Sequence, residues 1–425
     1  RKGSIMVAKD IWKRNWGGNS MEWKEVTLGE IGTIVGGATP STKNTSFYDG
    51  NIPWLTPKDL SVNSNKYILR GERNITEAGF KSCSCKMLPK GSVLFSSRAP
   101  IGYVAITAND MCTNQGFKSV IPNEETDSEF LYYLLKYNKD NIASQGSGTT
   151  FAEVSGKTMK EIEVMVPKET DDQHRIASIL SSLDRKIELN NKINADLEEM
   201  AQAIFKNWFV DLEPFKDGKF VDSELGMIPE GWKVGNIGDI VEFQNGFAFS
   251  SNDFSEYGEY KIITIKSVQD GCLLSEGSSK ISEYPTKMPA YCKLQSGDIL
   301  LSLTGNVGRC CLVTEPHLLL NQRVAKIKAK ESFDNSFSYA LFRLKETKEL
   351  LISISRGTAQ ANLSPVEASK LPMVIPSEDV RKKFSMFSDS IMDKIISIHI
   401  ENSRLSLLRD TLLPRLMSGE LEVPE

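Results

Sequence analysis

The chain contains an internal repeat of domain size, and this repeat constrains the fold more than any other feature of the sequence. The segment around Trp23, residues 22–31, recurs around Trp232 as residues 231–240. Further matches follow in the same order and at nearly the same spacing: 88–95 with 294–301, 99–102 with 305–308, 114–115 with 321–322, 130–134 with 337–341, 148–149 with 357–358 and 166–167 with 375–376. The preserved order predicts two domains of one fold.

Each half combines short β-branched runs, broken by Gly, Pro and Asn, with a long helical segment at its end. Two hairpins around the repeated turns and two short helices are predicted. They lie at 93–95 with 103–106, 299–303 with 309–313, 128–137 and 336–345. We therefore expect an α/β fold with two repeated, mixed but β-rich domains, over residues 21–167 and 226–376.

A long amphipathic helix is predicted after each domain, over residues 168–213 and 377–421. Its apolar residues alternate spacings of four and three, the pattern of a coiled-coil seam. The seam positions are Ile176, Leu180, Leu183, Ile187, Asn190, Asn194, Leu197, Ala201, Ile204 and Trp208 in the first helix, and Ile391, Ile395, Ile398, Asn402, Leu405, Arg409, Leu412 and Leu416 in the second. Pro414 interrupts the pattern near the end of the second helix.

The polar seam residues Asn190, Asn194 and Asn402 bear on how these helices pack. One interpretation is two ordinary core helices, each against its own domain. A core helix would favour Leu at such positions, whereas a buried Asn in a coiled coil fixes the register at some cost in stability. The three asparagines favour a coiled coil in which they set the register.

Composition excludes several other classes of protein. The seven cysteines are odd in number and contain no CxxC pair, so neither a disulfide framework nor a metal site is expected, and we expect reduced thiols in a cytoplasmic protein. No apolar run approaches the roughly 18 residues needed to span a bilayer. The formal net charge of -4 argues against a uniformly basic surface, so nucleic-acid contacts must come from local patches. Residues 1–20 are interpreted as a tag or an N-terminal extension.

The sequence lacks the common motifs of nucleotide and methyl-transfer enzymes. It has no GxxxxGK[ST] phosphate loop, no Asp/Asn-Pro-Pro-aromatic motif and no glycine-rich cofactor fingerprint after a strand. The three histidines, His174, His317 and His399, lie too far apart in sequence to suggest a local ligand set. We therefore assign no catalytic residue and no metal ligand.

Several segments resemble a known family. Residues 183–193, 204–211 and 222–232 are similar to the central conserved region of Type I restriction specificity subunits. The segment Leu412–Leu421 resembles the C-terminal ending of that family, and the two-repeat layout covers nearly the whole chain from Met21.

The resemblance implies a domain order and a function. Residues 21–167 and 226–376 would be two target-recognition domains, each binding one half of a bipartite double-stranded DNA target. The helices at 168–213 and 377–421 would form an antiparallel coiled coil between them, with pseudo-twofold symmetry. Residues 214–225 would be a linker and 422–425 a tail.

The resemblance also implies partners. Two methyltransferase subunits would bring S-adenosylmethionine and adenine-N6 methylation, and motor-nuclease subunits would add cleavage that depends on ATP and Mg. This chain would bind no cofactor of its own, would catalyse nothing and would not associate with a membrane.

Candidate DNA-binding residues are those polar and basic side chains in loops that suit base edges or phosphates. In the first domain they are Lys43, Asn44, Ser97, Arg98, Asn114, Gln115, Lys118 and Thr149. In the second they are Lys266, Thr304, Asn306, Arg309, Asn321, Gln322, Arg323, Arg356, Thr358 and Gln360.

Residues that recur in both halves are better suited to position the DNA backbone than to select bases, because the two half-sites differ. This applies to the Asn-Gln pairs at 114–115 and 321–322. The recurring Gly102, Gly148, Gly308 and Gly357 fit either turns of the fold or close approach to DNA. Arg98 and Arg356 are the leading specificity candidates, since Arg to guanine is the commonest base contact.

Two other functions stay open from the residues alone. The repeated domains could bind protein motifs, which would make the chain a coiled-coil adaptor. The chain could also be a nuclease with an unrecognised site, although the missing motifs disfavour an enzyme. Salt-dependent binding to duplex DNA would separate the first of these from a DNA-binding subunit.

Overall fold

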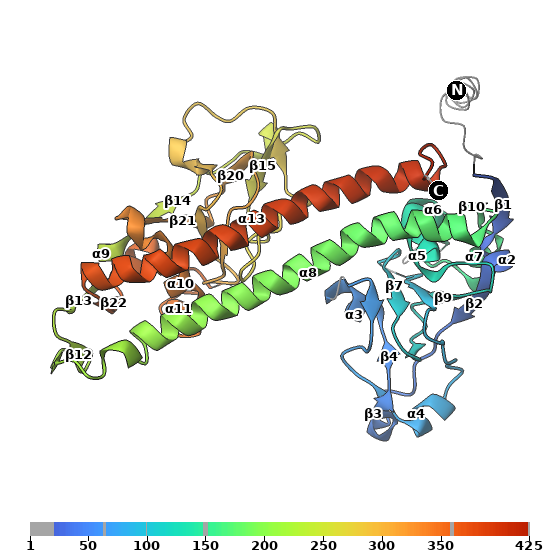
Figure 1. Cartoon of the computed structure of the whole chain (residues 1–425), viewed down its shortest axis with the longest axis horizontal. Helices are drawn as coiled ribbons and strands as arrows, with labels where there is room; N and C mark the ends of the chain where they lie inside the picture. Colours follow the sequence, from blue (N-terminus) through green and yellow to red (C-terminus); the bar gives the residue numbers. More distant parts are fainter. Residues whose placement is uncertain (1–20, 63–64, 99, 148–151, 358–360, 424–425) are drawn as a thin grey trace. The chain divides into compact units, whose positions relative to one another are not determined.

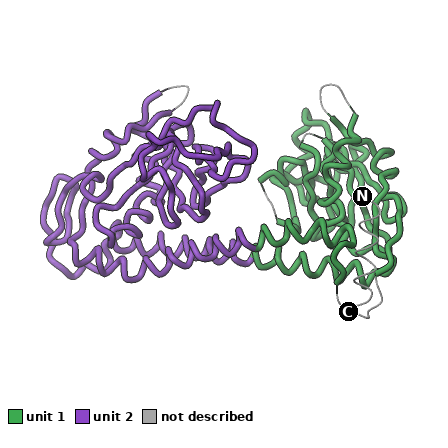
Figure 2. Tube along the Cα trace, turned by 90° about the horizontal axis from the view of Figure 1, so that it is seen from above, with its two compact units in different colours: residues 1–188, 405–425 green, residues 189–404 purple. Residues whose placement is uncertain are grey.

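The computed structural model describes residues 21–62, 65–98, 100–147, 152–357 and 361–423. Residues 1–20, the expected tag or extension, lie outside the described residues. The chain divides into two compact units, shown in Figure 2: unit 1 contains residues 1–188 and 405–425, and unit 2 contains residues 189–404. Each unit therefore holds one of the repeated domains together with parts of both long helices.

The main sheet of unit 1 has five strands in the order β2-β9-β6-β7-β5. All neighbours are antiparallel except β5 and β7, which are parallel. The strands are β2 (Gly32–Gly36), β9 (Lys118–Pro122), β6 (Val93–Phe95), β7 (Val104–Thr107) and β5 (Tyr67–Ile68). Two further pairs, antiparallel β1 (Trp23–Thr27) with β10 (Glu163–Pro167) and parallel β4 (Trp54–Leu55) with β8 (Cys112–Thr113), complete the strand pairing. The predicted hairpin of β6 and β7 is confirmed.

Side-chain alternation along β6 divides the core of unit 1 between the two faces of the sheet. Val93 and Phe95 pack with α5 (Ser128–Tyr137), whereas Leu94 packs with Phe117 on the other face. Figure 1 shows α5 beside this sheet. The remaining elements of unit 1 are α2 (Leu28–Ile31), η1 (Thr45–Phe47), β3 (Tyr48–Ile52), α3 (Pro57–Val62), α4 (Glu77–Lys81), α6 (Lys139–Ser144) and α7 (Gly156–Glu161).

Unit 2 repeats this topology. Its sheet β14-β21-β18-β19 corresponds to β2-β9-β6-β7, and its antiparallel pair of β13 and β22 corresponds to β1 and β10. The strands are β13 (Lys233–Asn236), β14 (Val241–Asn245), β18 (Ile299–Ser302), β19 (Cys310–Leu312), β21 (Val324–Ala329) and β22 (Pro372–Ile375). The structure thus confirms two α/β domains of one fold.

The two units differ in their outer strands. In unit 2 a second four-stranded sheet has the order β16-β15-β20-β17, whereas β5 of unit 1 joins the main sheet. The strands of this second sheet of unit 2 are β15 (Tyr260–Ile263), β16 (Lys280–Ile281), β17 (Lys293–Leu294) and β20 (Leu318–Leu320). The other elements of unit 2 are η2 (Glu213–Phe215), β11 (Phe220–Val221), β12 (Ile228–Pro229), α9 (Ile237–Ile240), η3 (Ser251–Asp253), η4 (Ala290–Cys292), η5 (Ser332–Asp334), α10 (Asn335–Arg343), α11 (Lys345–Ser353) and α12 (Pro365–Ser369).

The two long helices are α8 (Thr170–Phe209) and α13 (Glu378–Met417). Within unit 2 they run antiparallel, because Asn190 contacts Asn402 at one end of the paired stretch and Trp208 packs on Phe384 near the other. Pro414 lies inside the last turns of α13, which ends three residues later at Met417.

The helices also contribute to the domain cores. Ile176 and Leu180 of α8 are fully buried in the core of unit 1, together with Leu416 of α13. Phe205 of α8 and Phe384 of α13 are equally part of the core of unit 2. The helices therefore combine the two interpretations. They pair with each other, as a coiled coil does, and each also packs into the domain cores, as a core helix does.

The seam asparagines differ in their surroundings. Asn190 is buried, and its amide donates to Asn402 Oδ1 at 2.9 Å and to Glu401 Oε2 at 2.8 Å. The Asn402 amide in turn donates to Asn191 Oδ1 at 2.8 Å. Asn194 is buried too, but among the described residues its amide nitrogen and oxygen have no hydrogen-bond partner. A role in setting register stays a prediction for all three.

No helix within the described ranges combines the length and the apolar character that crossing a membrane requires.

Candidate DNA interface

Both units build the same set of backbone hydrogen bonds where the loop after β6 or β18 meets the segment before a short helix, α7 or α12. In unit 1, Val154 N donates to Ser97 O at 3.0 Å, and Glu153 and Ser147 exchange two bonds of 3.0 Å. The backbones of Arg98 and Glu153 also form an isolated antiparallel β-bridge. We call this arrangement the loop ladder.

The loop ladder of unit 2 has the same bonds in the same order. Leu363 N donates to Leu303 O at 2.7 Å, and Asn362 and Arg356 exchange bonds of 2.8 and 2.9 Å. The backbones of Thr304 and Asn362 form an antiparallel β-bridge that corresponds to the one between Arg98 and Glu153. The backbone frame is therefore common to both units, while the side chains on it differ.

In unit 1 the ladder carries charged side chains. Arg98 Nε lies 2.9 Å from Glu153 Oε2, and Lys118 Nζ lies 3.2 Å from Glu153 Oε1. Partial burial acts to raise the pKa of Glu153, but the hydrogen bonds from Arg98 and Lys118 outweigh it and hold the pKa below its ordinary value. The carboxylate is thus ionised at neutral pH and orients two cations.

In unit 2 the ladder is uncharged at the equivalent positions. The Thr304 hydroxyl donates to Asn362 Oδ1 at 2.9 Å. Beside this pair lies a hollow of about 720 Å³. It is lined by Asn245, Leu303, Thr304, Gln322, Arg323, Asn362, Leu363, Ser364 and Pro365.

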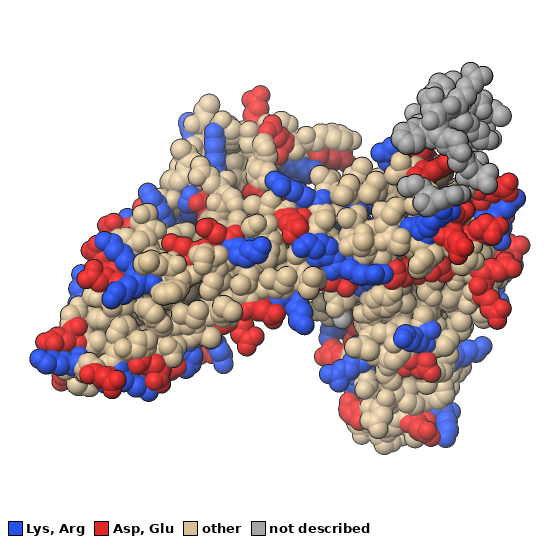
Figure 3. Space-filling view, in the orientation of Figure 1, with Lys and Arg blue, Asp and Glu red and all other residues tan. Residues whose placement is uncertain are grey.

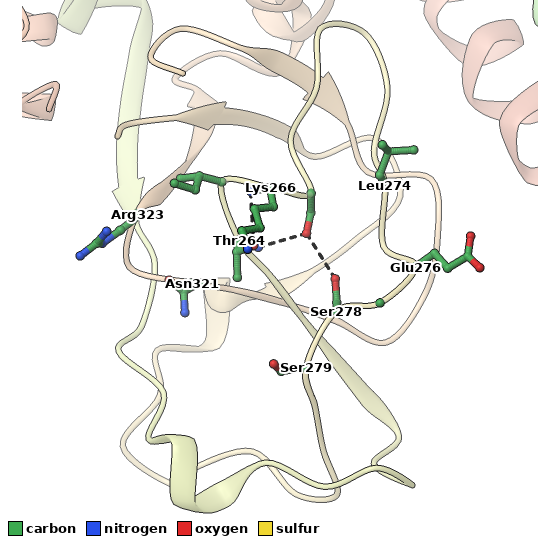
Figure 4. Close-up of a pocket in the computed structure, with 11 residues that line it drawn as sticks. Thr264, Lys266, Leu274, Glu276, Ser278, Ser279, Asn321 and Arg323 are labelled. Carbon is green, nitrogen blue, oxygen red and sulfur yellow. Dashed lines mark hydrogen bonds between the residues drawn. The ribbon is translucent and has the colours of Figure 1, made fainter. Parts of the chain in front are cut away.

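A second hollow, of about 520 Å³, lies next to the first, and Arg323 lines both. Its lining includes hydroxyl groups from Thr264, Ser278 and Ser279, the side chain of Lys266 and one acidic side chain, that of Glu276 (Figure 4). Ser267 and Ser278 share a hydrogen bond of 3.3 Å. Hydroxyl and cationic side chains of this kind are suited to phosphate oxygens.

The Asn-Gln pair of unit 1 makes hydrogen bonds within the fold, whereas Asn321 and Gln322 of unit 2 line the two hollows. Asn114 Oδ1 accepts from Gly116 N at 2.9 Å, and Gln115 accepts from the Thr39 hydroxyl. A β-carbon on Gly37 would lie 2.1 Å from the Asn114 carbonyl oxygen, and one on Gly246 would lie 2.1 Å from the carbonyl oxygen of Asn321. Both units therefore need glycine at this crossing for the strand to pass the Asn-Gln turn.

Three of the recurring glycines have backbone angles that favour glycine. Gly102, Gly308 and Gly357 have positive φ angles of 101°, 80° and 110°, which supports the turn interpretation, and close approach to DNA stays a prediction. Gly148 lies outside the described residues.

The predicted site residues do not all lie together. Arg98 and Lys118 meet at Glu153 in unit 1, and Lys266, Thr304, Asn321, Gln322 and Arg323 surround the two hollows of unit 2. Arg356 is exposed and belongs to the loop ladder of unit 2, whereas Lys43 and Asn306 are exposed on other loops. Thr149, Thr358 and Gln360 lie outside the described residues.

Three predicted residues form hydrogen bonds with other parts of the protein. The Ser97 side chain is fully buried and its hydroxyl donates to Gly116 O at 3.2 Å, so it holds the loop and presents nothing to a ligand. Asn44 caps η1 by accepting from Ser46 N at 3.1 Å. Arg309 donates to the side chain of Gln269.

Glu153 and Asn362 were missed by the sequence reasoning. A signal for them exists, because each lies two residues before a serine, Ser155 or Ser364, whose hydroxyl caps a short helix. Matching these caps across the repeat would have aligned Glu153 with Asn362.

Within the described ranges no group of three or more His, Cys, Asp or Glu side chains could hold a metal ion, and all seven cysteines are free thiols. On the face in Figure 3, basic and acidic side chains are interspersed.

Comparison with known proteins places the chain in a family. The model of the Type I restriction modification DNA specificity domain matches it twice, over residues 20–199 and 229–404. The Type I restriction enzyme MjaIX specificity subunit of Methanocaldococcus jannaschii is 36% identical over 412 residues, which cover 95% of this chain and 94% of that protein. The HindI specificity subunit of Haemophilus influenzae is 26% identical over 470 residues, covering 94% of this chain and all of that protein.

A solved structure supports the fold. The crystal structure of a Type I restriction-modification S subunit from M. genitalium superposes with a TM-score of 0.55 at 18% identity and covers 94% of this chain and 97% of that one. Two matches to the specificity domain and near full-length similarity to named specificity subunits show that this chain belongs to the family of Type I restriction-modification specificity subunits, whose role is DNA target recognition.

Proposed function

We propose that this specificity subunit recognises a bipartite double-stranded DNA target, with one half bound by unit 1 and the other by unit 2. The main observation in support of this proposal is the loop ladder, in which the same backbone frame bears Arg98 and Glu153 in unit 1 but Thr304 and Asn362 in unit 2. A shared frame with different polar side chains suits two domains that bind DNA alike and select different bases.

Local charge supports DNA binding by a chain whose formal net charge is -4. Lys266, Arg323 and Arg356 are exposed, and within the described residues none of them forms an ion pair. Two of them line the hydroxyl-rich hollow of unit 2. Unpaired cations at such a surface attract phosphates and release counterions on binding.

The same proposal covers the partners and the localisation. Two methyltransferase subunits, with S-adenosylmethionine, and motor-nuclease subunits, with ATP and Mg, would assemble on this chain in the cytoplasm. The chain itself would supply recognition and scaffolding without catalysis and without a cofactor. The internal repeat supports this, because two like surfaces on one chain suit two copies of one partner.

The test is to map methylated sites in cells that express the full chain with its methyltransferase partner, and then to titrate the purified complex with duplexes of the mapped sequence. We expect a target of two specified stretches around an unspecified spacer, and log affinity that falls linearly with log salt concentration. A single uninterrupted target would contradict the bipartite proposal. Salt-independent binding, or binding only to peptides, would instead favour a protein adaptor.

A further inference from the structure

We propose that the side-chain pair at the centre of each loop ladder is the specificity determinant of its unit: Arg98 with Glu153 selects a guanine in unit 1, and Asn362 with Thr304 selects an adenine in unit 2. The inference rests on the proposed function and assigns base classes to particular residues. Glu153 and Asn362 act by different means, the first as a positioning residue and the second as a base-contacting one.

The geometry of unit 1 suits guanine. The Arg98 side chain is 45% exposed, so its guanidinium can reach a ligand, and its Nε edge is held 2.9 Å from Glu153. Arginine has five N–H donors, and one contact with a carboxylate leaves donors for the O6 and N7 acceptors of guanine. Because Glu153 already restrains the side chain, less conformational entropy is lost on binding. Lys118 shares the carboxylate and keeps the group cationic overall.

The geometry of unit 2 suits adenine. Thr304 is 8% exposed and its hydroxyl occupies one lone pair of Asn362 Oδ1, which fixes the plane of the amide. The amide keeps its two N–H donors and a second lone pair, which match the N7 acceptor and the N6 donor of adenine. Asn362 is exposed and borders the larger hollow, so a base edge has access to it.

The common frame permits a clean exchange of the determinants. The strand register makes Ala325 of unit 2 the equivalent of Lys118, because these residues pair with Asn245 and Gly36 at matching ends of β14 and β2. The triple variant R98T/K118A/E153N therefore places the Thr and Asn of unit 2, together with Ala in place of Lys118, on the frame of unit 1. It also avoids leaving Lys118, whose side chain is 15% exposed, without its carboxylate.

The experiment maps methylated sites for the full complex with wild-type or triple-variant chain. We expect one G·C pair in one half of the target to be replaced by A·T, with a change in preference of roughly 5- to 150-fold at that position. The other half should be unchanged. The control E77N/K81T removes an exposed ion pair of unit 1, 3.0 Å long, and should leave the whole target unchanged.

Other outcomes overturn the inference. An unchanged target with efficient methylation by the triple variant would show that these side chains do not select bases, and so would a change confined to the other half. If the triple variant does not assemble, methylation mapping with the single variant R98K tests the inference instead, because lysine keeps the charge of Arg98 but loses its bidentate donors. Loss of discrimination at one G·C pair supports the inference, and full discrimination refutes it. Failure of the proposed function is distinct, since the wild-type complex would then show no bipartite target.

Discussion

The ion pair of Lys66 and Glu129 in unit 1 tests how the first domain is fixed to α8. Lys66 Nζ lies 3.0 Å from Glu129 Oε1 and 2.8 Å from the hydroxyl of Ser181 on α8. The side chains of Lys66 and Glu129 are only 2% and 16% exposed. Replacing Glu129 by Gln therefore leaves an ammonium group in a nearly dry site without its carboxylate.

The structure sets the expected magnitude. Removing one partner of a buried ion pair costs about 3–5 kcal/mol. Burial acts to raise the pKa of Glu129, but hydrogen bonds from Ser181, Tyr67 and Lys66 outweigh it and lower the pKa from 4.5 to about 2. This difference corresponds to about 3 kcal/mol of preference for the ionised carboxylate in the folded state. We expect E129Q to lower the free energy of unfolding of unit 1 by about 3–5 kcal/mol.

The same pair predicts a dependence on pH. The folded pKa of Glu129 lies below its unfolded value of 4.5, so its contribution to stability is complete above that pH. The contribution is lost as the pH falls from 4.5 towards 2. In E129Q this part of the acid dependence should disappear.

Hydrogen exchange in a urea series, followed by mass spectrometry, can resolve unit 1 from unit 2. The control is E77Q, which breaks a pair with Lys81 whose side chains are 75–80% exposed, and it should cost less than about 1 kcal/mol. The region of β10 and the start of α8 should lose protection in E129Q, while β13 and β14 should not. A loss in E129Q no larger than in E77Q would refute a stabilising role for the pair.

Three further predictions concern the fold and DNA binding. G37A should destabilise unit 1 in thermal melts, because its β-carbon would lie 2.1 Å from the carbonyl oxygen of Asn114. The control G36A should be tolerated, because the nearest atom to its β-carbon would lie 3.9 Å away. Equal melting temperatures of the two variants would contradict this prediction. R323A should weaken binding to all duplexes and reduce the salt slope by about one in affinity titrations, whereas R323K should keep the slope; an unchanged slope in R323A would count against a phosphate contact. Exchanging residues 21–167 for the equivalent domain of a relative should change one half of the mapped target, and a change in both halves would show that the units do not bind independently.

The parts of the fold that the sequence predicted are those set by local interactions. The expected helix at 128–137 is found as α5, since its apolar periodicity and the N-cap at Asp127, which accepts from Phe130 N at 2.7 Å, both lie within a few residues. The hairpin of β6 and β7 is likewise local. In contrast, the packing of Glu129 on Ser181 joins residues far apart in the chain, and no periodicity marks it.

The candidate site was harder to predict for the same reason. The loop ladder brings Arg98 to Glu153 and Thr304 to Asn362 across long intervals of sequence, so residue type alone selected Arg98 and Thr304 as candidates but not their partners. Residue type also selected Ser97, whose side chain is buried. Burial and pairing depend on the tertiary structure, and the residue types found in a loop do not reveal either of them.

The repeat is suited to the two half-sites that we propose, because one fold occurs twice in the chain. Features that build the frame, such as the glycines that cross the Asn-Gln turns at Gly37 and Gly246, must be the same in both units, because a side chain there would collide with backbone. Side chains that point from the frame face no such restriction and can differ. Arg98 and Thr304 occupy one backbone position in two chemical environments, one ionic and one neutral. Comparing the two units of one chain therefore distinguishes the shared framework, marked by Gly37 and Gly246, from the differing pairs Arg98–Glu153 and Thr304–Asn362, to which we assign base selection as a proposal.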